Sequence, residues 1–187
     1  MAFTKEQLAG YAGASVPDLL GDHCRLLFVG INPGLWTAAT QTHFCHPSNR
    51  FYPAMRRAGL IDWFVDTDHG MTGEQKSALI RVGIGITNLV NRATVRASEL
   101  GRGELAQGAR RLRRLAVELQ PAVVAVAGVT AFRQAFGRPG AALGPQEDGL
   151  AGSELWVVPN PSGLNAHETV DSLAGWYRRA ADAAGLR

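Results

Sequence analysis

Amide side chains and glycines follow the apolar runs of this chain, and these residue types could do chemistry. The first such segment, Gly30-Ile31-Asn32-Pro33-Gly34, places an asparagine in a sharp turn. Its glycines let backbone approach a ligand, and Pro33 restricts the turn. An amide fixed there can orient a water molecule, although it cannot take the proton of that water. An ordinary Asx turn would explain the same residues, so this motif alone does not establish catalysis.

The second segment, residues 159–165, reads PNPSGLN and repeats the pattern of prolines, small residues and amides. Leu164 is an apolar side chain within this polar turn. It either packs back into the core or protrudes as a wedge of the kind that enters a DNA base stack. The residues of this segment leave both interpretations open. The first segment has neither the glycine spacing of a dinucleotide site nor the ending of a P-loop, which argues against the common phosphate-binding loops there.

Four short apolar runs, residues 25–30, 82–89, 122–127 and 154–159, are predicted to be strands. Helical patterns lie between and after them, at residues 48–58, 73–81, 103–119, 130–136 and 167–184. This alternation predicts an α/β fold, a three-layer α/β/α sandwich around a short, about four-stranded parallel sheet. Residues 137–152 are expected to form a surface loop. Because ligands bind beyond the carboxyl ends of such strands, the two segments should lie together.

The composition describes a folded chain. Of its 187 residues 46% are hydrophobic and 19% are charged, which excludes wholesale disorder and favours one domain over 1–187. No apolar run reaches the length of a membrane span and the first residues lack a signal-peptide core, so we expect a cytoplasmic protein without a membrane partner. The net charge of +3 is compatible with a polyanionic partner. Arg110–Arg114 are expected to form a solvated helix face.

We expect neither a metal nor another cofactor. The chain has two cysteines, Cys24 and Cys45, which cannot supply a four-thiolate site and should be free thiols. His43 and His46 flank Phe44 and Cys45, but three possible ligands within four residues do not match the usual zinc spacings. His46 is better interpreted as a loop residue that supports a pocket wall.

Together the two segments are more specific than either alone. A strand ending in GINPGL, then an aromatic and HPSNRF, with a distal strand ending in PNPSGL, closely resembles the mismatch-specific uracil-DNA glycosylases. These are the bacterial relatives of thymine-DNA glycosylase in the uracil-DNA glycosylase superfamily. The likeness covers residues 26–60, 82–99, 120–136 and 156–164. It implies an α/β/α sandwich and an enzyme that flips a damaged or mismatched base out of double-stranded DNA and hydrolyses its N-glycosidic bond, which starts base excision repair.

The resemblance also implies roles for individual residues. Asn32 would be catalytic and position the hydrolytic water. Phe44 would stack on the flipped base, and the backbone of Gly30 and Ile31 would read the pyrimidine edge. Asn160 falls in the same pocket.

The remaining implied roles concern DNA. The loop that fills the vacated stack and touches the widowed partner base corresponds to Ser162, Gly163, Leu164 and Asn165. Asn49 and Arg50 lie near the predicted DNA face, and we expect Arg50 to contact a phosphate at the start of a helix.

The sequence departs from the family pattern at several positions. Stronger relatives have an Asp and a His where this chain has Asn32 and Asn160, so we expect a slow enzyme that depends on positioning. Ala166 stands where an Arg is usual, which predicts relaxed mismatch selectivity. Asn88 and Asn91 replace a Lys and an Asp; they are either pocket-rim residues or simple turn residues, and the second interpretation is favoured.

These observations predict a monofunctional DNA glycosylase for uracil and related pyrimidines, especially opposite guanine. We expect it to act as a monomer and to be associated with the nucleoid through DNA. A non-catalytic damage- or mismatch-sensing DNA-binding module is the alternative, because it would keep the wedge loop but would not require Asn32. A hydrolase or transferase of free nucleosides is disfavoured, because the strand-end segments supply amides instead of carboxylates.

Overall fold

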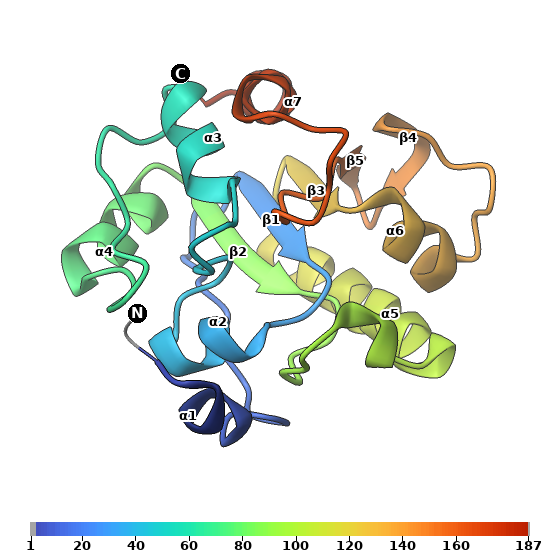
Figure 1. The fold of residues 1–187 in the computed structure, drawn as a ribbon. Coiled ribbons are helices and arrows are strands. Elements are labelled where there is room, and N and C mark those ends of the chain that lie inside the picture. Colours follow the sequence, from blue (N-terminus) through green and yellow to red (C-terminus); the bar gives the residue numbers. More distant parts are fainter. Residues whose placement is uncertain (1–2, 187) are drawn as a thin grey trace.

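The computed structural model describes residues 3–186, which form a five-stranded sheet with helices on both faces (Figure 1). The strands are β1 (Leu26–Gly30), β2 (Ile84–Asn88), β3 (Val123–Ala127), β4 (Gly144–Leu150) and β5 (Ser153–Val158). The helices are α1 (Lys5–Ala9), α2 (Leu35–Thr40), α3 (Phe51–Arg57), α4 (Gly73–Arg81), α5 (Arg102–Leu119), α6 (Val129–Phe136) and α7 (Val170–Ala183), with a short 3-10 helix at Ala97–Glu99.

The strand order is β2-β1-β3-β5-β4. The first four of these strands are parallel, and every residue of β1, β2 and β3 is buried. Apolar runs of this kind are typical of strands that helices cover on both faces. The predicted α/β fold is therefore confirmed, and the carboxyl ends of the parallel strands form one edge of the sheet.

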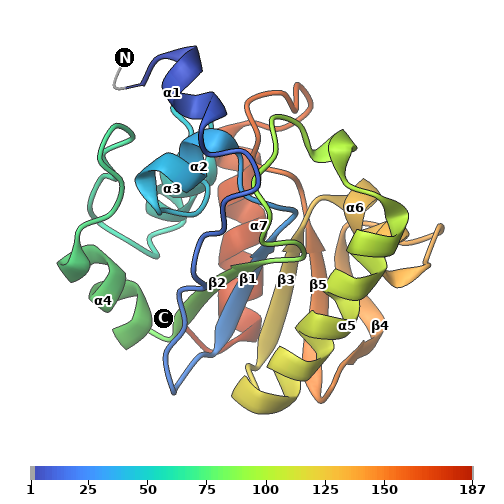
Figure 2. The same cartoon turned by 90° about the horizontal axis from the view of Figure 1, so that it is seen from below.

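Two hydrophobic cores lie on opposite faces of the sheet. One face packs against α3 and α7, where the rings of Phe28, Phe51 and Tyr177 contact one another. The other face packs against α5 and α6 through residues such as Leu112 and Phe132. Figure 2 shows α7 and α5 on the two sides of the strands. These layers hold the strand ends rigidly, which a site built on them requires.

The predicted four-stranded parallel sheet is wrong in one respect, because residues 144–150 form the antiparallel edge strand β4. Ala151 and Gly152, both with positive φ, connect β4 to β5 in a two-residue hairpin. The β4 sequence, GPQEDGL, has no β-branched residue and contains a proline, which an edge strand tolerates. The sequence pattern therefore indicated a loop. No helix within residues 3–186 has the length and hydropathy of a membrane span.

Candidate active site

The strand ends bring the two amide-rich segments together. Gly30, the last residue of β1, pairs with Asn88, the last residue of β2. Gly128 follows β3, and a Cβ built on it would lie 3.4 Å from Ile31 Cδ1 and 3.7 Å from Asn160 Cβ. The turn after β1 and the turn after β5 therefore meet over the end of β3, as the sequence predicts.

The side chain of Asn32 is held by hydrogen bonds on its nitrogen. Asn32 Nδ2 lies 3.1 Å from Pro33 O, 3.0 Å from Arg92 O and 2.7 Å from Thr94 Oγ1. Thr94 Oγ1 donates its own proton to Arg96 O, so it accepts from Asn32. All three partners are acceptors and share the two N–H groups of the amide, which fixes its orientation. No residue in 3–186 donates to Asn32 Oδ1, and this half-buried oxygen is free to accept a hydrogen bond from water.

Phe44 presents an aromatic ring beside these strand ends. Its φ of 58° lies in the left-handed region, which is uncommon for a residue other than glycine. The ring stacks on Phe51, with ring centres 4.1 Å apart and an interplanar angle of 20°. Phe51 is fully buried and contacts Phe28 and Tyr177 behind it. Phe44 is therefore a half-buried ring on a rigid aromatic support.

Asn88 lies inside this site, which corrects the interpretation of Asn88 as a turn residue. It ends strand β2 and is only 3% exposed. A Cβ on Gly30 would collide with Asn88 Oδ1 and would lie 3.0 Å from Phe44 Cζ. The absence of a side chain at Gly30 thus allows the amide oxygen and the ring to pack against the same glycine. Asn91 is half-buried, and its Oδ1 has no hydrogen-bond partner within the described chain.

The loop after β5 exposes Leu164. Its side chain is 93% exposed, which excludes the interpretation of Leu164 as a core residue. The neighbouring Gly163 lies against the loop that carries Phe44, because a Cβ on it would be 2.6 Å from Ser48 Oγ and 2.7 Å from Ser48 O. Only glycine fits this approach. The loop of residues 162–165, called the wedge loop below, is therefore docked on the pocket loop with its leucine in solvent.

Arg50 anchors the wedge loop. Its Nη2 donates to Ser162 O at 2.8 Å and to Asn165 O at 2.7 Å, and its Nη1 donates to Glu168 O. Its backbone N–H donates to Pro161 O at 2.9 Å. A guanidinium has five donors in a planar fork, and here they converge on backbone carbonyls. This arrangement makes Arg50 a structural anchor of the loop, and its expected phosphate contact stays a prediction.

Other polar side chains of the site also bond within it. Asn160 Oδ1 accepts from Ser162 N at 3.0 Å, and Asn165 Nδ2 donates to Asn160 O at 2.9 Å. Asn49 Oδ1 accepts from Phe51 N at 2.9 Å at the start of α3. Asn49, Ser162 and Asn165 thus stabilise the turns that carry the site. Asn160 Nδ2 donates no hydrogen bond within residues 3–186, so this group is available to a ligand.

A sequence profile of the uracil DNA glycosylase superfamily matches residues 17–181, which is most of the chain. The chain belongs to this superfamily. Its structure is also similar to the solution NMR structure of a Methanosarcina acetivorans protein described as a candidate uracil DNA glycosylase. The TM-score is 0.56 at 18% identity, and the match covers 89% of this chain and 96% of that one. At this identity the likeness concerns the fold.

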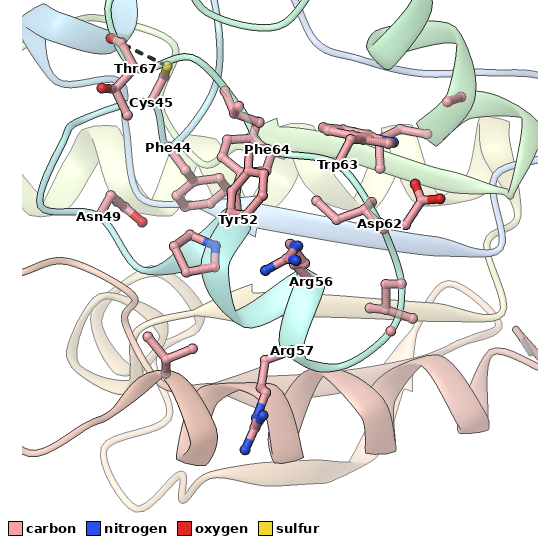
Figure 3. A pocket seen from close by; sticks show the side chains of 18 of the residues that line it. Phe44, Cys45, Asn49, Tyr52, Arg56, Arg57, Asp62, Trp63, Phe64 and Thr67 are labelled. Carbon is pink, nitrogen blue, oxygen red and sulfur yellow. Dashed lines mark hydrogen bonds between the residues drawn. The ribbon is translucent and has the colours of Figure 1, made fainter.

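This uracil DNA glycosylase superfamily member also has a groove of about 990 Å³ along α3 (Figure 3). Its wall includes Phe44, Tyr52 and Arg56, and the guanidinium of Arg56 lies 4.0 Å from the centre of the Phe64 ring. The strand-end amides do not line this groove. Phe44 therefore separates the amide cluster from an aromatic and basic groove along α3.

The helix arginines of this superfamily member are not all solvated. Arg111 bonds Asp18 at 3.0 Å and Thr87 Oγ1 at 2.9 Å, and it also donates to Asn88 O. The expectation of a solvated face is therefore wrong for Arg111, which ties α5 to the end of β2. A helical pattern cannot reveal this, because the acceptors come from two distant segments.

The described residues contain no group of three or more side chains placed to hold a metal ion. Cys24 and Cys45 are buried free thiols, and burial raises the pKa of Cys24 to about 11.

Proposed function

We propose that this chain is a monofunctional DNA glycosylase that extrudes uracil, and related damaged or mismatched pyrimidines, from double-stranded DNA and hydrolyses the N-glycosidic bond. The proposal includes a preference for guanine as the partner base and action as a cytoplasmic monomer without a cofactor. The observation that carries it is the locked Asn32 amide with its free Oδ1, two residues after Gly30, against which the ring of Phe44 packs. Superfamily membership supports the same reaction class.

The proposed chemistry depends on positioning. Glycosidic cleavage passes through an oxocarbenium-like sugar and a departing pyrimidine anion. Asn32 Oδ1 accepts a hydrogen bond from a water molecule. This bond orients the water so that a lone pair of the water oxygen points at the sugar carbon. The water bonds to the sugar carbon after the bond to the base has largely broken, and its proton passes to the departing pyrimidine anion, so no strong base is needed. Asn160 Nδ2 is available to donate to an oxygen of the departing base as negative charge develops there.

Asn88 provides the polar contact to the edge of the extruded base. Its Oδ1 lies next to Gly30 and Phe44, where a base stacked on Phe44 would present its edge. Uracil carries an N3–H donor beside its O4 acceptor, and an amide can pair with both groups. Asn88 therefore reads the pyrimidine while Phe44 holds its face.

Replacing Phe44 with alanine should weaken binding of an extruded base by about 1 to 3 kcal/mol, because the ring supplies a stacking surface. Binding to undamaged duplex should hardly change. Fluorescence titration with duplexes that contain a mismatched uracil, or no lesion, measures both. Equal losses on the two duplexes would contradict the stacking role.

The Leu164→Ala variant should slow excision of a paired uracil more than excision of a mismatched or single-stranded one. Only the paired base costs a few kcal/mol to extract, and the wedge would offset this cost. Because Leu164 is 93% exposed, the melting temperature should not fall. Uniform losses on all three substrates would rule out the wedge.

Single-turnover cleavage of labelled duplexes tests the proposal directly. The duplexes carry uracil, thymine, hypoxanthine or ethenocytosine, each opposite guanine and adenine. We expect cleavage of uracil opposite guanine to be fastest. The alternative, a non-catalytic damage- or mismatch-sensing module, predicts binding to mismatched DNA without cleavage, and binding that survives Asn32→Ala.

A further inference from the structure

A buried histidine lies behind Asn88 and bonds through both ring nitrogens. His43 is 2% exposed. Its Nε2 lies 2.9 Å from Pro17 O, and its Nδ1 lies 3.1 Å from Asn88 Nδ2. The three groups form a chain that starts at a backbone carbonyl before β1 and ends at the amide that faces Phe44.

The carbonyl of Pro17 determines which group donates and which accepts in both hydrogen bonds of His43. Pro17 O can only accept, so His43 Nε2 carries the proton. Burial lowers the pKa of His43, which keeps the ring neutral near pH 7 and leaves Nδ1 without a proton. A bare Nδ1 can only accept, so Asn88 must turn its Nδ2 toward His43. Its Oδ1 must then point away from His43, and it does lie against Gly30, the glycine on which the Phe44 ring also packs.

We propose that His43 is a positioning residue that fixes the Asn88 amide in the orientation that accepts uracil and rejects cytosine. This inference rests on the proposed function, in which Asn88 reads the base. Uracil offers an N3–H donor to Oδ1, and its O4 can accept from the second Nδ2 proton. Cytosine offers a bare N3 and an amino group, so it would need the amide turned by 180°. His43 prevents that turn, because Oδ1 facing its bare Nδ1 would place two acceptors together.

Two variants separate this role from packing. His43→Gln keeps a donor for Pro17 O and an acceptor for Asn88, because the same carbonyl orients the new amide. His43→Met is similar in length but offers neither group. The probes are duplexes that contain 2′-fluorodeoxyuridine or 2′-fluorodeoxycytidine opposite an abasic analogue. The fluorine blocks cleavage. Because neither uracil nor cytosine has a partner base in these duplexes, the two probes do not differ in the cost of breaking a base pair.

The measured quantity is the ratio of the dissociation constants for the cytosine and uracil probes. The wild type and His43→Gln should favour the uracil probe by about tenfold, the value of one well-made hydrogen bond of about 1.4 kcal/mol. In His43→Met the ratio should fall toward one, because Asn88 can turn. An unchanged ratio in a folded His43→Met variant would overturn the proposal, as would equal losses in both variants.

Nitrogen-15 NMR of the wild-type ring tests the tautomer without any substitution. We expect a protonated Nε2 and an unprotonated Nδ1 for His43, and the opposite tautomer would overturn the proposal even if both variants failed to fold. Failure of the glycosylase proposal is distinguishable, because the fluorinated probes report binding alone. A chain that cleaves nothing but prefers the uracil probe through His43 would refute the enzyme and retain the positioning role.

Discussion

Asn32→Ala should lower the single-turnover rate of uracil excision by about 10²-fold or more, which corresponds to about 3 kcal/mol of activation free energy. Asn32 Oδ1 is the free acceptor of an amide whose nitrogen is held by three partners, so alanine removes the group that orients the water. Binding to abasic product should change little, because the wedge loop and Phe44 stay in place. Rapid-quench kinetics and a product-binding titration measure the two effects.

Asn91→Ala is the matched control for this prediction. Asn91 is also an amide that follows a strand end, but its buried Oδ1 has no partner in the part of the chain that the structure describes. We expect its excision rate to stay within about threefold of the wild type, as for most substitutions away from reacting groups. If Asn32→Ala also cleaved within that range, Asn32 would be only a turn residue.

Phe51→Ala should lower the free energy of unfolding by about 3 to 5 kcal/mol, the usual cost of removing a buried phenylalanine ring. Phe51 is fully buried and stacks directly behind Phe44. The substitution should therefore also weaken binding of an extruded base, because the Phe44 ring loses its support. Urea unfolding measures the first effect, and titration with a mismatched-uracil duplex at low temperature measures the second.

Phe132→Ala separates these two effects. Phe132 is equally buried, but it lies on the opposite face of the sheet and stacks on Phe136 in α6. Its stability loss should be similar, whereas base binding by the folded fraction should match the wild type. If both variants lost base binding equally, the support of Phe44 by Phe51 would have no functional role.

The sequence pattern predicted the elements whose signals are local. The apolar runs identified the four parallel strands, and residues 73–81 were predicted as a helix with the observed bounds, preceded by a Thr72 capping box. Strand β4 could not be recognised, because Pro145 and the charged residues within it resemble a surface loop. Pairing with β5 holds residues 144–150 in a strand, although the β4 sequence carries no strand signal.

In the candidate site, too, the sequence predicted only the residues whose signals are local. Asn32 and Leu164 stand in short motifs, and their positions at a strand end and in an exposed turn follow from those motifs. The environments of Arg50, His43 and Asn88 depend on partners between 26 and 118 residues away. No local pattern carries such information. The position of Asn88 near the carboxyl end of an apolar run was the one signal that could have placed it in the pocket.

The anchoring of the wedge loop by Arg50 has a consequence for the thermodynamics of DNA binding. Because protein donors already satisfy its carbonyls at Ser162 and Asn165, the loop meets DNA in one arrangement. Its conformational entropy is lost when the chain folds, so this loss does not weaken the complex. In the proposed function, encounter with DNA would then require no prior ordering of the loop, and Leu164 would reach each base pair already in its exposed position.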